Sequence, residues 1–233
     1  MKLTKEEKLI KERERLELMR CYEKECRESG YSLIYGIDEA GRGPLCGPVV
    51  AGCCILPADA EILYLNDSKK LSEEKREELY AEITEKAFAW GTGQADAARI
   101  DEINILNATF EAMREAFINC RSMAAQKLSA ASVNEGTFSA GSEIVLVDGN
   151  KTVPGIHIAQ KAIVKGDANS VSVAAASILA KVTRDRMLYK YDEMYPEYGF
   201  AKHKGYGTKA HIEALKKYGP LDFHRKSFIG KFV

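Results

Sequence analysis

The chain has 233 residues, of which 34 are Lys or Arg and 34 are Asp or Glu, so its formal net charge is zero. This length allows one domain with a sizeable core, and 45% hydrophobic with 29% charged residues is typical of a folded globular protein rather than a disordered one. A balanced charge argues at first against a nucleic-acid partner, which usually binds a basic surface. However, residues 1–150 carry 27 acidic and 19 basic residues, whereas residues 151–233 carry 7 and 15.

The chain shows neither a secretory signal nor a membrane span. The segment from Met1 to Glu28 is densely charged and lacks an apolar core, and the most apolar stretch, Pro44 to Pro57, is shorter than the roughly 20 residues of a span. The six cysteines form no C-x-x-C pair and precede all four histidines, so the local spacing predicts no zinc cluster and indicates reduced thiols. We therefore expect a cytoplasmic protein without membrane contact.

The order of apolar and polar residues predicts alternating strands and helices. Residues 4–28 predict a charged helix, and the next helical patterns lie at 72–86, 101–128 and 169–191. Thr208 caps a further short helix, and Pro220 begins a tail. Strands are predicted at residues 31–37, 48–56, 88–97, 144–147 and 156–164. Residues 129–142 form a low-complexity loop and 195–207 a loop rich in Tyr, Gly and Lys. This pattern predicts an α/β fold, with a mixed central sheet flanked by helices and a helical C-terminal segment.

Acidic residues stand where predicted strands end. Asp38 and Glu39 end the first strand. Asp148 ends a later strand, and Asp167 follows the next one. Four acids at one edge of a sheet would repel one another unless a cation is present, and oxygen ligands in this number suit Mg²⁺ or Mn²⁺ rather than zinc. Each acid alone is explained at least as well as a turn residue, above all in the pair Asp148-Gly149.

The segment Gly41-Arg42-Gly43 follows directly after the first two acids. Glycines let backbone amides approach an anion closely. A plain tight turn explains these three residues equally well, and the spacing does not fit a Walker phosphate-binding loop.

Five ordered stretches resemble one family. Residues 35–50 read YGIDEAGRGPLCGPVV, which is similar to the opening motif of type 2 ribonuclease H, or ribonuclease HII. The other stretches are NDSKKLS at 66–72, IDEINILNAT at 100–109, KGDANS through AAASILAKVTRD at 165–185, and YPEYGFAKHKGYGT at 195–208, with HRKSF at 224–228. The resemblance covers roughly residues 33–228. The Gly-Arg-Gly spelling and the short N-terminal extension fit type 2 better than type 3.

The resemblance implies a ribonuclease H-like fold and an endoribonuclease that cuts the RNA strand of RNA/DNA hybrids and also cuts at ribonucleotides embedded in duplex DNA. It implies two-metal-ion hydrolysis with Mg²⁺ or Mn²⁺, which leaves a 3′-hydroxyl and a 5′-phosphate. The residues that match the family's catalytic, metal-binding acids are Asp38, Glu39, Asp148 and Asp167.

The resemblance also implies the substrate contacts. Backbone groups of Gly41, Arg42 and Gly43 read the ribose 2′-hydroxyl, and Tyr206 packs against the sugar on its 3′ side. Without the resemblance, Tyr206 is better explained as a loop aromatic packed on the core. Lys69 is expected to contact phosphate, because it lies in a matched motif at an Asp-Ser turn. Weaker phosphate-contact candidates, each more often a solvated surface charge, are Lys181, Arg184, Lys202, Lys204, Arg225 and Lys226.

In this interpretation residues 1–30 are an N-terminal helical extension and residues 31–233 the catalytic domain of a monomer. The role of the extension and that of residues 129–142 stay open, and the tail Phe228–Val233 is too weak a motif to predict a sliding-clamp partner. Two alternatives remain. One is another acid-cluster nuclease of the same fold, such as a resolvase or a type 3 ribonuclease H. The other is a nucleic-acid-binding module without catalysis, which the four acids disfavour because bare carboxylates repel phosphate.

Overall fold

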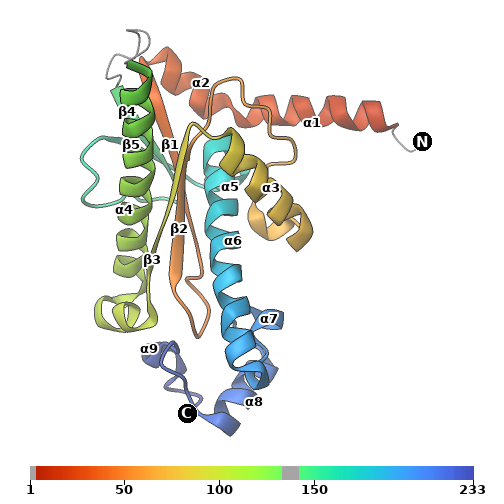
Figure 1. Cartoon of the computed structure of the whole chain (residues 1–233), viewed down its shortest axis with the longest axis vertical. Coiled ribbons are helices and arrows are strands. Elements are labelled where there is room, and N and C mark those ends of the chain that lie inside the picture. Colours follow the sequence, from red (N-terminus) through yellow and green to blue (C-terminus); the bar gives the residue numbers. More distant parts are fainter. Residues whose placement is uncertain (1–3, 133–141) are drawn as a thin grey trace.

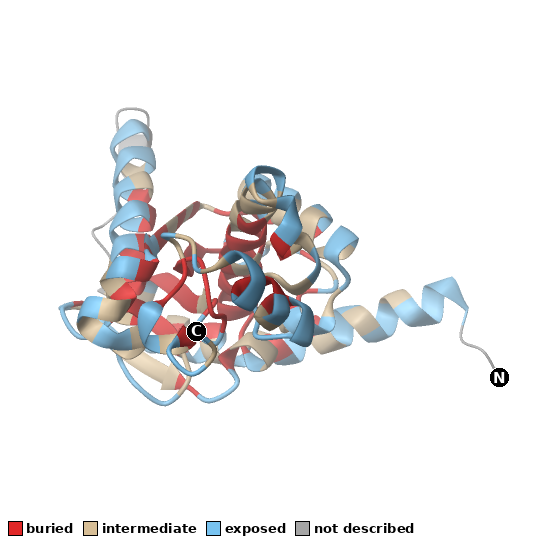
Figure 2. Ribbon diagram, turned by 90° about the horizontal axis from the view of Figure 1, so that it is seen from below, coloured by how far each residue is buried: buried red, intermediate tan, exposed pale blue. Residues whose placement is uncertain are grey.

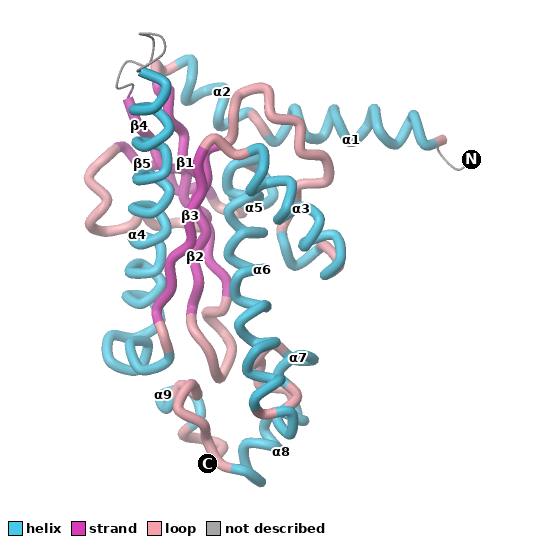
Figure 3. The backbone as a smooth tube through the Cα atoms, in the orientation of Figure 1, coloured by secondary structure: helices cyan, strands magenta, loops and turns pink. Residues whose placement is uncertain are grey.

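A single mixed sheet of five strands forms the centre of the molecule in the computed structural model, which describes residues 4–132 and 142–233 (Figures 1 and 3). The strand order is β3-β2-β1-β4-β5, and the strands are β1 (Tyr31–Ala40), β2 (Val49–Ile55), β3 (Ala89–Ala95), β4 (Ser142–Asp148) and β5 (Ala159–Ile163). The first three strands pair antiparallel, whereas β4 is parallel to β1 and β5 is parallel to β4.

Helices cover both faces of this sheet, as predicted (Figure 1). On one face α4 (Ala97–Ser132) packs against β1, β2 and β3; on the other lies α6 (Val171–Met194), with α3 (Glu73–Lys86) outside it. The predicted C-terminal helical segment consists of α7 (Phe200–His203), α8 (Lys209–Tyr218) and α9 (Lys226–Ile229). Helix α7 packs beside the C-terminal part of α6, and α9 lies near α4 (Figure 1). Figure 2 shows that buried residues concentrate along the sheet and its flanking helices. None of the helices in the described ranges is both long and apolar enough to cross a membrane.

Small residues let α6 approach the sheet closely. A Cβ atom added to Gly36 would lie 2.2 Å from the carbonyl carbon of Ser172, and one added to Gly52 would lie 2.3 Å from the carbonyl oxygen of Ala176. Both distances are far below van der Waals contact, so only glycine fits at these positions. This packing fixes the start of α6 against β1, and the preceding short helix α5 (Gly166–Asn169) lies next to α6 and β4.

Some boundaries differ from the predicted ones. The predicted helix 4–28 is two helices, α1 (Lys5–Met19) and α2 (Cys21–Glu28), which meet at Arg20 because its ψ angle of 2° is not helical. The first strand continues beyond residue 37, since its pairing with β2 extends to Ala40 opposite Val50. The expected strand 156–164 begins only at Ala159.

Two predicted loops also differ. The loop 195–207 contains a 3₁₀ turn, η2 (Pro196–Tyr198), and α7. In the predicted loop 129–142, residues 129–132 belong to α4, and residues 133–141 lie outside the described residues. Simple propensity did not find the helical turns, because Pro and Gly in these segments indicate loops.

The N-terminal helices dock on the rest of the fold through a buried acid. Glu23 of α2 accepts hydrogen bonds from the Ser170 hydroxyl at 2.5 Å and the Ser172 N–H at 3.0 Å. It therefore caps the first turn of α6 from outside that helix. Leu16 and Met19 of α1 are also buried against the core, whereas the N-terminal part of α1 projects away from it (Figure 1).

We expect Glu23→Ala to lower the free energy of unfolding by about 1–2 kcal/mol, because it removes the carboxylate that accepts from the Ser170 hydroxyl and the Ser172 N–H in the first turn of α6. Urea unfolding followed by circular dichroism measures this change. The matched control is Glu25→Ala on the same helix, which removes only an exposed ion pair with Lys161 and is expected to cost less than about 0.5 kcal/mol. Equal losses in the two variants would contradict a capping role for Glu23.

Candidate active site

The pairing of β1 with β4 brings two of the predicted acids together. Ile37 lies opposite Val147 in the parallel register, so the next residues, Asp38 and Asp148, are neighbours at the carboxyl ends of the two strands. Asp38 belongs to β1 itself rather than to the turn that follows it. Side chains at this edge of a parallel pair commonly form the binding site of an α/β sheet.

Asp167 joins the same cluster from α5, which is a helical turn rather than the end of a strand. The N–H of Gly166 donates to Asp148 Oδ1 at 2.7 Å, and the N–H of Asp167 approaches the same oxygen at 3.4 Å. These bonds hold the turn against the end of β4, so that the two carboxylates face a common space.

Burial and mutual repulsion raise the pKa values of these carboxyl groups. Asp38 is 6% exposed, and its pKa lies well above the usual range, first because of burial and then because of the nearby Glu39 and Asp148. Burial also raises the pKa of Glu39, although Arg42, 3.3 Å away, opposes this effect. Burial and then Asp148 raise the pKa of Asp167 to about 6. The cluster thus holds more negative charge than its surroundings compensate, which is the condition that a bound cation relieves.

Lys69 lies beside these acids on the 3₁₀ turn η1 (Ser68–Lys70). Asp67 caps this turn by accepting from the Lys69 N–H at 2.9 Å, and the hydroxyl of Ser177 in α6 accepts from the Ser68 N–H at 3.2 Å. Partial burial lowers the pKa of Lys69, but the neighbouring carboxylates, Asp38 foremost, outweigh it and raise the pKa overall. Lys69 is therefore a fixed positive charge at the rim of the acid cluster.

Asp67 is a further acid near the site that sequence reasoning missed. It is close enough to contribute to the raised pKa of Asp167. The sequence offered only its place in a matched motif, where a turn-capping role explains it fully.

The Gly41-Arg42-Gly43 segment and Tyr206 are neighbours, although 163 positions separate Gly43 from Tyr206 in the chain. A Cβ atom on Gly43 would lie 3.7 Å from Cε1 of the tyrosine ring. Tyr206 is 44% exposed, so it is not buried in the core. The two elements together form an open surface next to Glu39, with which the Arg42 side chain pairs.

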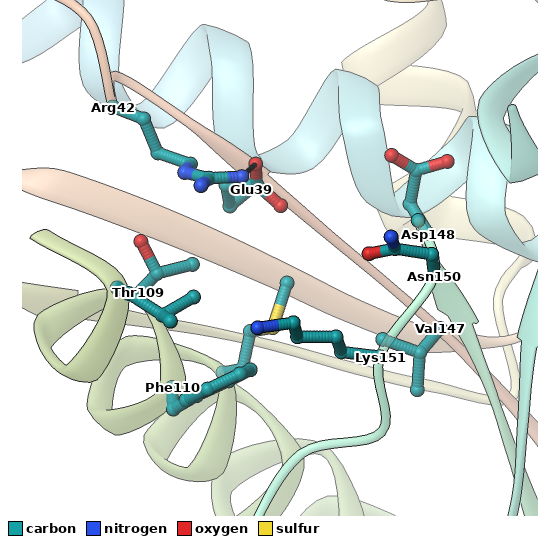
Figure 4. A pocket seen from close by; sticks show the side chains of 11 residues that line it. Glu39, Arg42, Thr109, Phe110, Val147, Asp148, Asn150 and Lys151 are labelled. Atoms are coloured by element: carbon teal, nitrogen blue, oxygen red, sulfur yellow. Dashed lines mark hydrogen bonds and ion pairs between the residues drawn. The ribbon is translucent and has the colours of Figure 1, made fainter. Parts of the chain in front are cut away.

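A cavity of about 200 Å³ opens beside Glu39 and Asp148 (Figure 4). Thr109 and Phe110 of α4 line one side, and the turn after β4 contributes Asn150 and Lys151, neither of which sequence reasoning singled out. Their only signal in the sequence was the position directly after Asp148-Gly149.

The weaker phosphate-contact candidates fall into two groups. Lys202 and Lys226 are exposed, as a phosphate contact requires, whereas the other four bind groups within the protein. Lys181 pairs with Asp185 at 2.7 Å, and Lys204 donates to a main-chain carbonyl at 2.6 Å.

Arg184 and Arg225 are fully buried, so they are neither phosphate contacts nor the solvated surface charges that the sequence favoured. Their guanidinium groups bind main-chain carbonyls instead. A pattern of basic residues cannot reveal this, because arginine is ordinarily a surface residue.

The fold brings Cys46, in the segment between β1 and β2, close to His211 and His224. The potential ligand atoms of these three residues lie within 4.8 Å of one another. Hydrogen bonds occupy the ring nitrogens. The Leu221 N–H donates to His224 Nδ1 at 2.9 Å, so the proton of His224 is on Nε2 and points to His211 Nε2 at 3.1 Å. His211 Nδ1 in turn donates to the Tyr206 carbonyl at 3.0 Å. Burial lowers the pKa of both histidines to about 4, and the cluster is a neutral hydrogen-bonded chain beneath Tyr206 rather than a metal site.

Comparison with known proteins identifies the family. The family model described as Ribonuclease HII matches residues 35–231. A ribonuclease HII of Clostridioides difficile (strain 630) is 52% identical over 230 residues, which cover 98% of this chain and 83% of the relative.

Solved structures of the same family share the fold. The ribonuclease H2 of Pyrococcus horikoshii is 26% identical with a TM-score of 0.60, and the match covers 86% of this chain and 97% of that one. The ribonuclease HII of Archaeoglobus fulgidus, solved in complex with PCNA, is also 26% identical with a TM-score of 0.57, over 83% and 94% of the two chains.

These matches answer the alternatives that the sequence left open. The family model spans most of the chain and is that of type 2, which excludes a type 3 ribonuclease H, a resolvase and a non-catalytic binding module as its family. In the described structure, Asp38 and Asp148 lie side by side at the carboxyl ends of β1 and β4. The chain therefore belongs to the ribonuclease HII family and is a metal-dependent endoribonuclease of the ribonuclease H type.

Proposed function

We propose that this enzyme cuts both the RNA strand of RNA/DNA hybrids and single ribonucleotides embedded in duplex DNA, with its four acids holding two Mg²⁺ or Mn²⁺ ions. The acids are Asp38, Glu39, Asp148 and Asp167. The observation that carries the proposal is their meeting at the ends of β1 and β4, together with the raised pKa values of Asp38 and Asp167. A set of hard carboxylate oxygens fits ions of this class.

The chain's own residues orient the substrate around this cluster. Bound divalent ions would supply positive charge against the phosphate oxygens and activate the attacking water. The β1–β4 register and the backbone bond from Gly166 hold the carboxylates in place before substrate binds. Lys69, at the rim, would hold a phosphate oxygen of the cleaved strand. The products are a 3′-hydroxyl and a 5′-phosphate.

The loop beside the acids would select the ribose. Backbone groups of Gly41, Arg42 and Gly43 would contact the 2′-hydroxyl, which is both donor and acceptor and which DNA lacks. Tyr206 would pack against the sugar on the 3′ side, where a deoxyribose fits best. The closeness of Gly43 to the tyrosine ring supports this, because both elements can then contact one dinucleotide.

We propose no clamp contact for the C-terminal tail, although a relative was solved with PCNA. In this chain Ile229 is buried, and Phe228 and Phe232 pack beside Leu45 and Leu215. We propose that the enzyme acts as a cytoplasmic monomer with residues 1–30 as an extension of the catalytic domain.

Three matched duplexes test the function: all-DNA, DNA with one ribonucleotide, and a long RNA/DNA hybrid. With Mg²⁺ we expect cleavage of the two ribonucleotide-containing duplexes and none of the all-DNA duplex, as resolved on denaturing gels. EDTA should stop cleavage, and excess Mg²⁺ should restore it. Cleavage of the all-DNA duplex at a similar rate, or cleavage in EDTA, would refute the proposal, and an uncut single-ribonucleotide duplex would refute its second activity.

A further inference from the structure

Two arginines with no carboxylate partner lie buried beneath the loop that joins β1 to β2. Arg184 of α6 is 1% exposed and Arg225, next to α9, is 0% exposed. Neither forms an ion pair with any acid in the described ranges. Burying a charge without a counter-charge is costly unless hydrogen bonds replace its hydration, so the carbonyls that surround these groups require an explanation.

The guanidinium group of Arg225 forms hydrogen bonds to both ends of this loop. Its Nη1 donates to the carbonyl of Arg42 at 2.9 Å, and its Nη2 donates to that of Gly41 at 2.6 Å. The carbonyl of Gly47 accepts from Nη2 at 2.9 Å and from Nε at 3.0 Å. Since the guanidinium is planar and rigid, it fixes the positions of these three carbonyls relative to one another.

Arg184 ties the same loop to the segment that carries Tyr206. Its Nη2 donates to the Cys46 carbonyl and its Nε to the Pro48 carbonyl, and its Nη1 donates to the Lys204 carbonyl, all at 3.0 Å. The fit is close, because a Cβ atom on Gly41 would lie 2.1 Å from Arg184 Nε. Gly41 also has a φ angle of +95°, a backbone conformation that residues with a side chain rarely adopt.

Because peptide groups are planar, the hydrogen bonds to the loop carbonyls also determine where the loop N–H groups point. In a trans peptide the carbonyl and the following N–H point in opposite directions, and the described residues contain no cis bond. With the carbonyls of Gly41 and Arg42 held toward Arg225, the N–H groups of Arg42 and Gly43 must point away from it. Both residues are exposed, and within the described chain neither N–H donates to a protein group.

We propose that Arg225, helped by Arg184, is a positioning residue that presents the Arg42 and Gly43 amides to the ribose without touching the substrate. The inference rests on the proposed function, in which this loop reads the 2′-hydroxyl. It assigns these arginines to selectivity for ribose rather than to general affinity for nucleic acid.

A phosphate-binding role and a positioning role for Arg225 predict different binding behaviour. A phosphate contact strengthens binding to every duplex alike, and its loss lowers the slope of log affinity against log salt by about 0.9. A positioning residue changes only the preference for a duplex that contains a ribonucleotide, and the salt slope stays the same.

Binding is measured by fluorescence anisotropy in Mg²⁺, in an Asp38→Asn background that leaves the duplexes uncut. We expect Arg225→Lys to reduce the preference for the one-ribonucleotide duplex over all-DNA by about tenfold, because lysine cannot bridge three carbonyls. Affinity for all-DNA should stay within about twofold. The matched control is Arg186→Lys, an exposed arginine of α6 paired with Glu77, which should leave both affinities unchanged.

A retained preference in folded Arg225→Lys would overturn the proposal, as would an equal loss on both duplexes with a smaller salt slope. Thermal melting by circular dichroism checks the fold. If Arg225→Lys does not fold, Arg184→Lys loosens the same loop from its other end, and a retained preference there overturns the proposal too. If the Asp38→Asn background protein itself shows no ribonucleotide preference, it is the proposed function of the loop that fails.

Discussion

Replacing Asp38 by Asn is expected to lower the cleavage rate of a one-ribonucleotide duplex by about 10³-fold or more, because it removes the central carboxylate of the cluster. Asp38 is buried between Glu39 and Asp148, and an amide in its place keeps the shape but loses the charge. Single-turnover cleavage in Mg²⁺ measures the change. The matched control is Asp59→Asn, which alters an exposed acid in the loop after β2 and should leave the rate unchanged.

The same substitution is expected to stabilise the metal-free protein. The pKa values of Asp38 and Asp167 are raised in the folded state, so folding favours their protonated forms. The stability that they contribute is complete below the unfolded pKa of about 4 and is lost as the pH rises through the folded value, which is about 6 for Asp167. At neutral pH in EDTA, Asp38→Asn should therefore unfold at a higher temperature than the parent protein.

Two outcomes would contradict this account of Asp38. Retained cleavage would remove Asp38 from the catalytic set. A metal-free Asp38→Asn protein that is less stable than the parent at neutral pH, but equally stable near pH 4, would show that the carboxylate is not repelled by its neighbours. The comparison with the parent at each pH cancels the other titrating groups, including His211 and His224, whose lowered pKa values act in the opposite direction.

The strand ends and the matched motifs were enough to predict which acids meet, but not how they meet. The register of β1 against β4 joins residues about 110 positions apart, and no local pattern encodes it. Asp167 was expected at a strand end and lies on a helical turn instead, because its position depends on backbone bonds to Asp148 that exist only in the folded chain.

Basic residues were the least predictable part of the site. Lys69 could be singled out because a turn motif surrounds it. Arg184 and Arg225 could not be recognised as buried, because all but one of the carbonyls that compensate their charge come from residues 41–48, more than 130 positions earlier. The zero net charge of the chain also gives no indication that some of its basic residues are buried. Part of the positive charge in residues 151–233 holds the main chain in place, and only the remainder is exposed to a duplex.

Tyr206→Ala is expected to lower the cleavage rate at a single embedded ribonucleotide by roughly 10- to 100-fold, the worth of one aromatic contact with a nucleotide. The ring is half exposed beside Gly43, so truncation removes little from the core. The main chain at this position should stay in place, since His211 holds the Tyr206 carbonyl and the Tyr206 N–H donates to the His203 carbonyl. Single-turnover rates on the one-ribonucleotide duplex and the long hybrid measure the effect.

The comparison of the two substrates identifies what the ring contacts. If Tyr206 packs on a 3′ deoxyribose, its loss should cost more on the single ribonucleotide than on the hybrid, where the 3′ sugar is a ribose. Tyr206→Phe keeps the ring and should keep most of the activity, and Tyr218→Ala removes a comparably exposed tyrosine of α8 as a matched control. Equal losses on both substrates would place the ring in general duplex binding, and unchanged rates would remove it from the site. Only a selective loss on the single ribonucleotide ties the tyrosine to the sugar that follows the cut ribonucleotide.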